Sequence, residues 1–219
     1  LQAAERQAEV LRRRLRGAPD GEATIAAATK AAATRSYYVA VRGGHHVFVS
    51  GGDGGTEKLR STRALIDKVA LAEGRDPAQV PVGLLRACFA SNNPAEVDHY
   101  LEVARYQRRV ALSLKRRTAQ IADDYEVEEG IAEGEPTLEE MRAMLPVGPV
   151  DLVIERVVNE IRTLKPVHYC FQTQMGDFDQ PTMLRHLALW GEVIIPAVQR
   201  EIANDPPHVA EPVAELAVA

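Results

Sequence analysis

Short runs of β-forming residues alternate with amphipathic helical stretches along most of this chain of 219 residues. The β-rich runs lie at residues 37–41, 46–50, 82–90 and 167–174. The run at 82–90 is continuously apolar rather than alternating, which is typical of a strand that is covered on both faces. Alternating strands and helices form βαβ units around a parallel sheet, so the pattern predicts an α/β fold.

Helical stretches separate and flank the β-rich runs. Apolar residues recur at helical spacing in these stretches, which lie at residues 2–16, 22–34, 56–73, 94–117, 137–144, 151–164 and 182–202. The architecture that repeats such units in sequence is the (β/α)8 TIM barrel, and four strands are too few to close its cylinder. We therefore expect an incomplete or truncated TIM barrel: some strands have escaped detection, or another chain or a longer form of this protein supplies the rest.

The expected domain organisation is simple. One barrel-type domain should cover residues 1–204, and residues 205–219 should form a flexible tail. The acidic, glycine-containing segment 123–136 is expected to be a surface insertion.

Charge and composition exclude several classes of partner. The formal net charge of −5 argues against nucleic acid as the main partner. No apolar run approaches the ~20 residues of a membrane helix, and no signal segment is visible, so we expect a cytoplasmic protein without a membrane partner. Cys88 and Cys170 lie in apolar runs without metal-ligand spacing, which favours small buried hydrophobes in a reducing compartment. We expect no metal site.

A glycine-rich loop follows the β-rich run at 46–50 and precedes a helical stretch. Its sequence, Gly51-Gly52-Asp53-Gly54-Gly55, allows main-chain N–H groups to approach a phosphate, and a helix N-terminus adds partial positive charge. The spacing matches neither the dinucleotide fingerprint nor the P-loop motif. A phosphate site and a plain turn that needs positive φ angles therefore both stay open.

Polar residues in two apolar runs are further candidates. Gln172 and Gln174 lie on the same side of the last run, where they could hydrogen-bond a ligand or simply cover the barrel rim. Arg86 is either a buried cation whose partner the sequence does not reveal or a contact for an anion, because an unpaired buried charge is too costly.

Five stretches together resemble the luciferase-like, flavin-dependent monooxygenases, in the order in which that family has them. LPVGPVD at 145–151 resembles the entry to the family's last unit, and PVHYCFQTQMGD at 166–177 is similar to its final barrel strand and the glycine that follows. LRHLALWGEVIIP at 184–196 resembles the closing helix. Further upstream, HVFVSGG at 46–52 and GRDP at 74–77 resemble an earlier strand and turn.

The resemblance implies a flavin-dependent enzyme that carries the later units of the barrel. It implies monooxygenation of a small organic substrate with reduced flavin and oxygen, FMN or alternatively a deazaflavin as the cofactor, and a dimer that works with a flavin reductase. The flavin-binding residues that it implies are Ser50, Gly51, Gly52, Gly54, Gly55 and Gln172; it assigns no catalytic residue. The alternatives are a non-catalytic flavin-binding or partner subunit and, from another class, a helical interaction protein built around residues 94–117.

Overall fold

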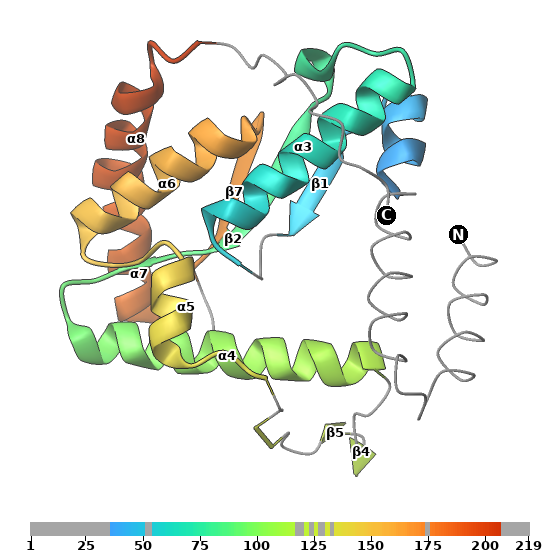
Figure 1. Ribbon diagram of the computed structural model, residues 1–219. Coiled ribbons are helices and arrows are strands. Elements are labelled where there is room, and N and C mark those ends of the chain that lie inside the picture. Colours follow the sequence, from blue (N-terminus) through green and yellow to red (C-terminus); the bar gives the residue numbers. More distant parts are fainter. Residues whose placement is uncertain are drawn as a thin grey trace. The chain divides into compact units, whose positions relative to one another are not determined.

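The computed structural model describes residues 36–50, 54–116, 121–122, 125–126, 130–131, 134–173 and 176–206 (Figure 1). The chain divides into two compact units. Of the described residues, the first unit holds 36–47 and 63–81, and the second holds 48–62 and 82–206. We describe each unit by itself.

The first unit corrects one expectation from the sequence. Residues 36–43, which include the β-rich run at 37–41, form a helix and not a strand. Val41 is buried at 1% exposure, and the helix ends at Gly44, whose φ of +70° suits glycine. A short apolar run of this kind fits a helix or a strand equally well, and packing decides between them.

The remainder of the first unit contains the C-terminal part of α3 (Thr56–Ala72) and a 3-10 turn, η1 (Pro77–Gln79). Arg63 on α3 forms a buried ion pair with Asp67, one helical turn later, at 2.6 Å. Arg63 also donates to the carbonyl of Pro77 at 2.7 Å, which connects the helix to the turn that follows it.

A parallel sheet lies at the centre of the second unit. Its strand order is β1 (Val47–Ser50), β2 (Val82–Ala87), β7 (His168–Gln172), and β2 pairs with β7 in parallel from Gly83↔His168 to Ala87↔Gln172. Beyond Cys88 the same stretch continues as β3 (Phe89–Ala90), which pairs in parallel with β6 (Val147–Gly148). The predicted α/β class with parallel strands is confirmed. The sequence pattern missed β6, whose two residues lie between prolines.

Six helical segments of the described residues complete this unit. They are α4 (Pro94–Arg116), α5 (Leu138–Met144), α6 (Val150–Leu164), α7 (Gln180–Leu189), the π-helical segment η2 (Trp190–Ile194) and α8 (Ile195–Ile202). The predicted helices at 94–117, 137–144, 151–164 and 182–202 are confirmed. The segment η2 precedes Pro196, which has no N–H to continue the regular ladder of hydrogen bonds. A two-strand antiparallel pair, β4 (Ile121–Ala122) with β5 (Tyr125–Glu126), lies next to and partly within the segment predicted as an insertion.

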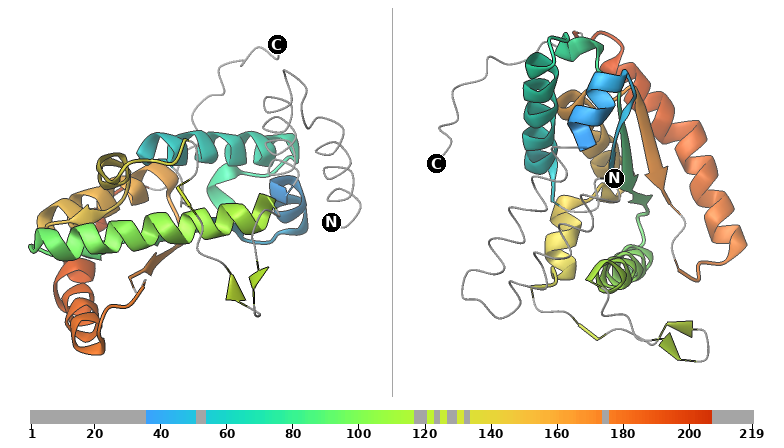
Figure 2. Two further views of the ribbon diagram at one scale, coloured as in Figure 1. Left: turned by 90° about the horizontal axis from the view of Figure 1, so that it is seen from below. Right: turned by 90° about the vertical axis from the view of Figure 1, so that its right-hand side faces the viewer.

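One face of the sheet packs against helices. Cys88 and residues of β3 and β7 meet α6, η2 and α8 there, and Phe171 stacks on Trp190 with ring centroids 4.1 Å apart. Figure 2 shows α7 and α8 alongside β7, and α4 crossing near the ends to which β2 and β7 run. Phe89 packs against Tyr100 of α4 in a second buried cluster, with centroids 4.7 Å apart.

The opposite face of the sheet is partly open. Phe48 is 58% exposed, and its ring lies over Gly83, where an added Cβ would come within 2.7 Å of it. On β7, His168 and Cys170 are exposed, whereas Tyr169 and Phe171 between and beyond them face the helices. Parallel sheets are normally covered on both faces. The described sheet therefore fits a segment of an incomplete barrel whose inner side the described residues cover only in part.

The two cysteines provide a test of this arrangement. Cys170 is expected to react rapidly with a thiol reagent, whereas Cys88 is fully buried, and burial raises the pKa of its thiol. Titration of the folded chain with Ellman's reagent should give one fast thiol, which Cys170→Ser removes and Cys88→Ser does not. Equal rates at both thiols would contradict the assignment of the two faces.

None of the helices in the described ranges has both the length and the apolar character needed to span a bilayer.

Candidate functional site at the carboxyl ends of the strands

The carboxyl ends of the parallel strands and the segments that follow them form one edge of the second unit. In barrels of this type the functional face is built from these segments, because each strand delivers its last residues and its following loop to the same end. Gly54 and Gly55 follow β1, Ser91 follows β3, and Pro149 follows β6 at this edge.

The structure brings Ser50 and Gln172 to the same edge. Ser50 is the exposed last residue of β1, and Gln172 is the half-buried last residue of β7. Because β2 lies between the two strands, they are two strand spacings apart, about 10 Å. Gly51 and Gly52, as well as Asp53 and Gln174, lie outside the described residues.

The described part of the glycine loop has the geometry of a helix entry. Gly54 has a φ of +78°, and the carbonyl of Gly55 accepts N–H bonds from Lys58 and Leu59, so Gly55 begins the hydrogen-bond ladder of α3. A side chain at Gly54 would place its Cβ 3.0 Å from the Cβ of Lys58. Glycine is thus required for the turn.

Gln172 contributes its backbone to the structure of the edge. Its carbonyl accepts from the Tyr100 hydroxyl at 2.6 Å and from the Cys88 N–H at 3.2 Å. These contacts fix the end of β7 against α4 and β3 and leave the side-chain amide for other contacts.

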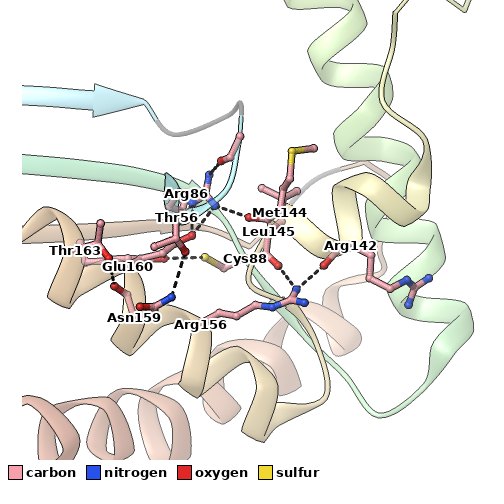
Figure 3. Close-up of polar contacts among 12 residues, drawn as sticks. Thr56, Arg86, Cys88, Arg142, Met144, Leu145, Arg156, Asn159, Glu160 and Thr163 are labelled. Carbon is pink, nitrogen blue, oxygen red and sulfur yellow. Dashed lines mark hydrogen bonds and ion pairs between the residues drawn. The ribbon is translucent and has the colours of Figure 1, made fainter. Parts of the chain in front are cut away.

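The partner of Arg86, which the sequence did not reveal, is Glu160 of α6 (Figure 3). Arg86 is fully buried and the Glu160 side chain is 3% exposed, and three N–H···O contacts of 2.5 to 3.1 Å join them. Burial acts to lower the pKa of Arg86, but the charge and hydrogen bonds of Glu160 outweigh this effect and raise it. Arg86 therefore stays charged, and of the two interpretations left open by the sequence, the buried, paired cation is the correct one.

The sequence did contain a signal for Glu160. It lies three residues after Val157 and four before Leu164, on the apolar stripe of α6 where a carboxylate is unexpected. A buried cation and a misplaced acid are natural partners, but only the fold shows that two such residues meet.

The ion pair is part of a larger hydrogen-bonded network. Tyr169 donates to Glu160 at 2.6 Å, and its hydroxyl lies 3.6 Å from the sulfur of Cys88. Burial raises the pKa of Tyr169 well above its ordinary value, so the phenol keeps its proton and acts as a donor. Cys88 is thus a small packed residue of this network, as expected from the sequence, and not a nucleophile.

Arg86 also connects the network to two loops of the carboxyl edge. Its guanidinium donates to the carbonyl of Met144 at 2.8 Å and approaches that of Gly54 at 3.5 Å. Beside it, Asn159 donates to the Thr56 hydroxyl at 3.3 Å, which joins α6 to the first residue of α3. The network therefore holds the glycine loop and the segment before β6 on one buried support (Figure 3).

A groove of about 240 Å³ opens at the same edge, between the end of β3 and α7. Its lining is formed by Phe89, Ala90, Ser91, Asn92, Glu96, Val150, Thr182, Arg185, His186 and Leu189. A larger hollow of about 550 Å³ in the first unit has fewer polar groups, and Arg42 in its wall is engaged by Glu73. The groove is therefore the better candidate for a ligand-binding site.

Structural comparison finds a similar fold in solved monooxygenases. The monooxygenase RslO1 of Streptomyces bottropensis superimposes with a TM-score of 0.51 at 18% identity, over 74% of this chain and 45% of that one. The oxygenating constituent of 3,6-diketocamphane monooxygenase from Pseudomonas putida, solved in complex with FMN, gives 0.50 at 17% identity, again over 74% and 45%. This chain therefore shares the fold of part of these two monooxygenases.

The fold-level resemblance predicted from the sequence motifs is thereby confirmed. A sequence relative, the uncharacterized protein y4vJ of Sinorhizobium fredii, is 42% identical over 180 residues, which are 82% of this chain and 50% of that protein. The chain thus spans about half the length of this curated relative and less than half of each of the two structures. No protein-family model matches the sequence.

Proposed function

We propose that this chain is part of a flavin-dependent monooxygenase that acts on a small organic substrate with reduced flavin and oxygen. The observation that supports the proposal is the position of the glycine loop and Gln172 at the carboxyl edge of a sheet whose fold is shared with an FMN-containing monooxygenase. Ligands of such barrels bind at this edge.

The described residues fit a flavin phosphate. Gly54, at a φ of +78°, and Gly55 lead into α3, a helix of 17 residues whose N-terminus carries partial positive charge. Lys58 in the first turn adds a cation. These groups would hold the phosphate, and the side-chain amide of Gln172 would hydrogen-bond the ring or the substrate.

The chemistry of the reaction would come from the cofactor. Reduced flavin supplies the electrons with which oxygen is activated, and the protein supplies orientation and a dry pocket. In this chain, Arg86 and Glu160 would act by fixing the glycine loop, and α4 would cover the end of the sheet against water.

A pair of glycine variants tests the phosphate site. Gly54→Ala should raise the Kd for FMN about tenfold, because a side chain at positive φ costs roughly 1–2 kcal/mol and forces the loop away from Lys58. Gly74→Ala is the matched control: its φ is +68°, nothing lies within 4 Å of an added Cβ, and it follows the other end of α3. FMN fluorescence quenching measures both.

Equal Kd values for Gly54→Ala and the parent chain would show that the loop is a simple turn and does not bind the phosphate. The same titration with a deazaflavin distinguishes the two cofactor types. If neither flavin binds to the chain, the enzyme proposal fails.

The uncovered sheet face favours a second candidate, a non-catalytic flavin-binding or partner subunit of such an enzyme. A subunit of this kind would need its open face, with Phe48 and Cys170, covered by other strands. We also propose a cytoplasmic location, a homo- or heterodimer and a flavin reductase as partner. Size-exclusion chromatography with light scattering, and flavin-dependent oxygen consumption with added reductase, test these points.

A further inference from the structure

His186 on α7 is the one buried histidine among the described residues. Its hydrogen bonds show that its two ring nitrogens have different roles. It is 4% exposed and stacks on Phe89 with centroids 4.3 Å apart. Its Nε2 accepts the backbone N–H of Ala90 at 2.8 Å and the indole N–H of Trp190 at 3.3 Å. Because Nε2 is the acceptor, the proton of the neutral ring is on Nδ1.

The Nδ1–H group of His186 has no acceptor among the described residues. Burial lowers the pKa of this histidine to about 4, although Glu96 acts in the opposite direction, so the ring is neutral at pH 7. A buried donor without an acceptor costs about 1–3 kcal/mol, and such a group in a folded protein requires an explanation. A ligand that enters the adjoining groove and accepts this hydrogen bond would explain the buried donor.

The remaining lining of the groove indicates what kind of acceptor it would be. Asn92, Thr182 and Arg185 present an amide, a hydroxyl and a guanidinium. Arg185 donates to the Thr182 hydroxyl at 2.8 Å, which leaves most of its donors for other contacts. Arg185 and His186 Nδ1 can only donate, whereas Asn92 and Thr182 can donate or accept, which favours an anionic ligand with at least two oxygens.

The single carboxylate in the lining does not reverse this balance. Glu96 accepts a hydrogen bond of 2.6 Å from Ser91, which in turn accepts from the N–H of Asn93. The groove also lies at the N-terminal end of α4, a helix of 23 residues, where the helix dipole favours an anion.

Size and apolar contacts limit the ligand further. The groove volume of about 240 Å³ is below the roughly 300–1,000 Å³ of sites for drug-sized molecules. Val150 and Leu189 supply apolar wall next to the donors. A short aliphatic chain that ends in a carboxylate satisfies both conditions.

We propose that this groove binds a small aliphatic carboxylate, with one carboxylate oxygen accepting from His186 Nδ1–H, the other from Arg185, and the chain against Val150 and Leu189. Because Nδ1 has less than 1 Å² of exposed surface, this binding mode requires a small shift of the lining when the ligand enters. The site does not depend on flavin binding.

The test is a titration of the full chain with butyrate, followed by the ¹⁵N shifts of labelled histidine side chains and by calorimetry. We expect saturable binding with a Kd of about 1 mM, as suits a ligand of ~six heavy atoms, and a shift of the His186 Nδ1 resonance. His186→Gln keeps an amide oxygen for the Ala90 N–H and removes the Nδ1 donor, so it should raise the Kd at least fivefold.

Exposed arginines provide matched variants that leave the core intact. Arg185→Gln should also raise the Kd at least fivefold, whereas Arg200→Gln on α8, outside the lining, should not change it. Butyramide should bind more weakly than butyrate. Non-saturable binding, unchanged affinity in both His186→Gln and Arg185→Gln, or tighter binding of inorganic phosphate would each overturn the proposal; the first would mean that Nδ1 meets at most a water molecule.

Discussion

Replacement of Glu160 by alanine is expected to lower the free energy of unfolding by about 3–5 kcal/mol, because the Arg86 guanidinium would remain charged and fully buried without its carboxylate. This is a large share of the roughly 5–15 kcal/mol that stabilises a typical domain. Urea denaturation followed by circular dichroism measures the change, and an unchanged m-value shows that the transition stays two-state.

The double variant Arg86→Met/Glu160→Leu should recover most of that loss. With both charges absent, apolar side chains of similar size can fill the site, and buried pairs replaced in this way are often neutral or even stabilising. If Glu160→Ala alone does not fold, a folded double variant still supports the explanation. A double variant that is as unstable as the single one would show that the network acts by shape and not by charge compensation.

A matched control exists on the same helix. Arg162 pairs with Asp205 at 2.9 Å, but its side chain is 45% exposed. Arg162→Ala should therefore cost far less than Glu160→Ala, as is usual for surface pairs. A similar cost for Glu160→Ala and Arg162→Ala would refute the importance of burial.

Stability is expected to fall as the pH decreases from about 6.5 to about 4, because of His186. Its pKa in the folded chain is about 4, whereas the ordinary value, which applies to the unfolded chain, is 6.5. Within this window the unfolded chain binds a proton that the folded chain does not, so acid favours unfolding. The contribution of neutral His186 to the free energy of unfolding is complete above pH 6.5 and is lost as the pH falls to about 4. The total loss is on the order of 3 kcal/mol.

The charged groups near His186 modify this effect without removing it. Glu96 from α4 acts to raise the pKa of His186 and burial outweighs it, and Arg185 of α7 lies in the same groove wall. Urea unfolding of the parent chain and of His186→Gln at pH 7, 5.5 and 4.5 separates the effect of this histidine on stability from that of the other titrating groups, because both chains share those groups. The difference in stability between the two should shrink or reverse towards low pH; a constant difference would contradict a buried, neutral His186.

Several elements could be predicted from the sequence because their signals are local. Apolar spacing indicated α4 and α6, and the continuous apolar run at 82–90 indicated the central strand. The same reasoning failed at residues 37–41, where a few β-forming residues lie in a helix, and at β6, where two residues between prolines pair with a distant strand. Local preference is weak over such short segments, and tertiary contacts override it.

Part of the candidate site could also be predicted from the sequence. The position of the glycine loop after β1 and of Gln172 at the end of β7 followed from the order of residues, because parallel strands deliver their ends to one edge.

The amino-acid sequence by itself thus determined the α/β class, the direction of the strands and the edge at which function is sought, since these depend on periodicity and on glycine. Only the tertiary structure decided that Arg86 meets Glu160, 74 residues away, and that Ala90 donates to His186, 96 residues away. The energy of a buried charge or an unpaired donor depends on what surrounds it, and no local stretch of sequence contains those surroundings.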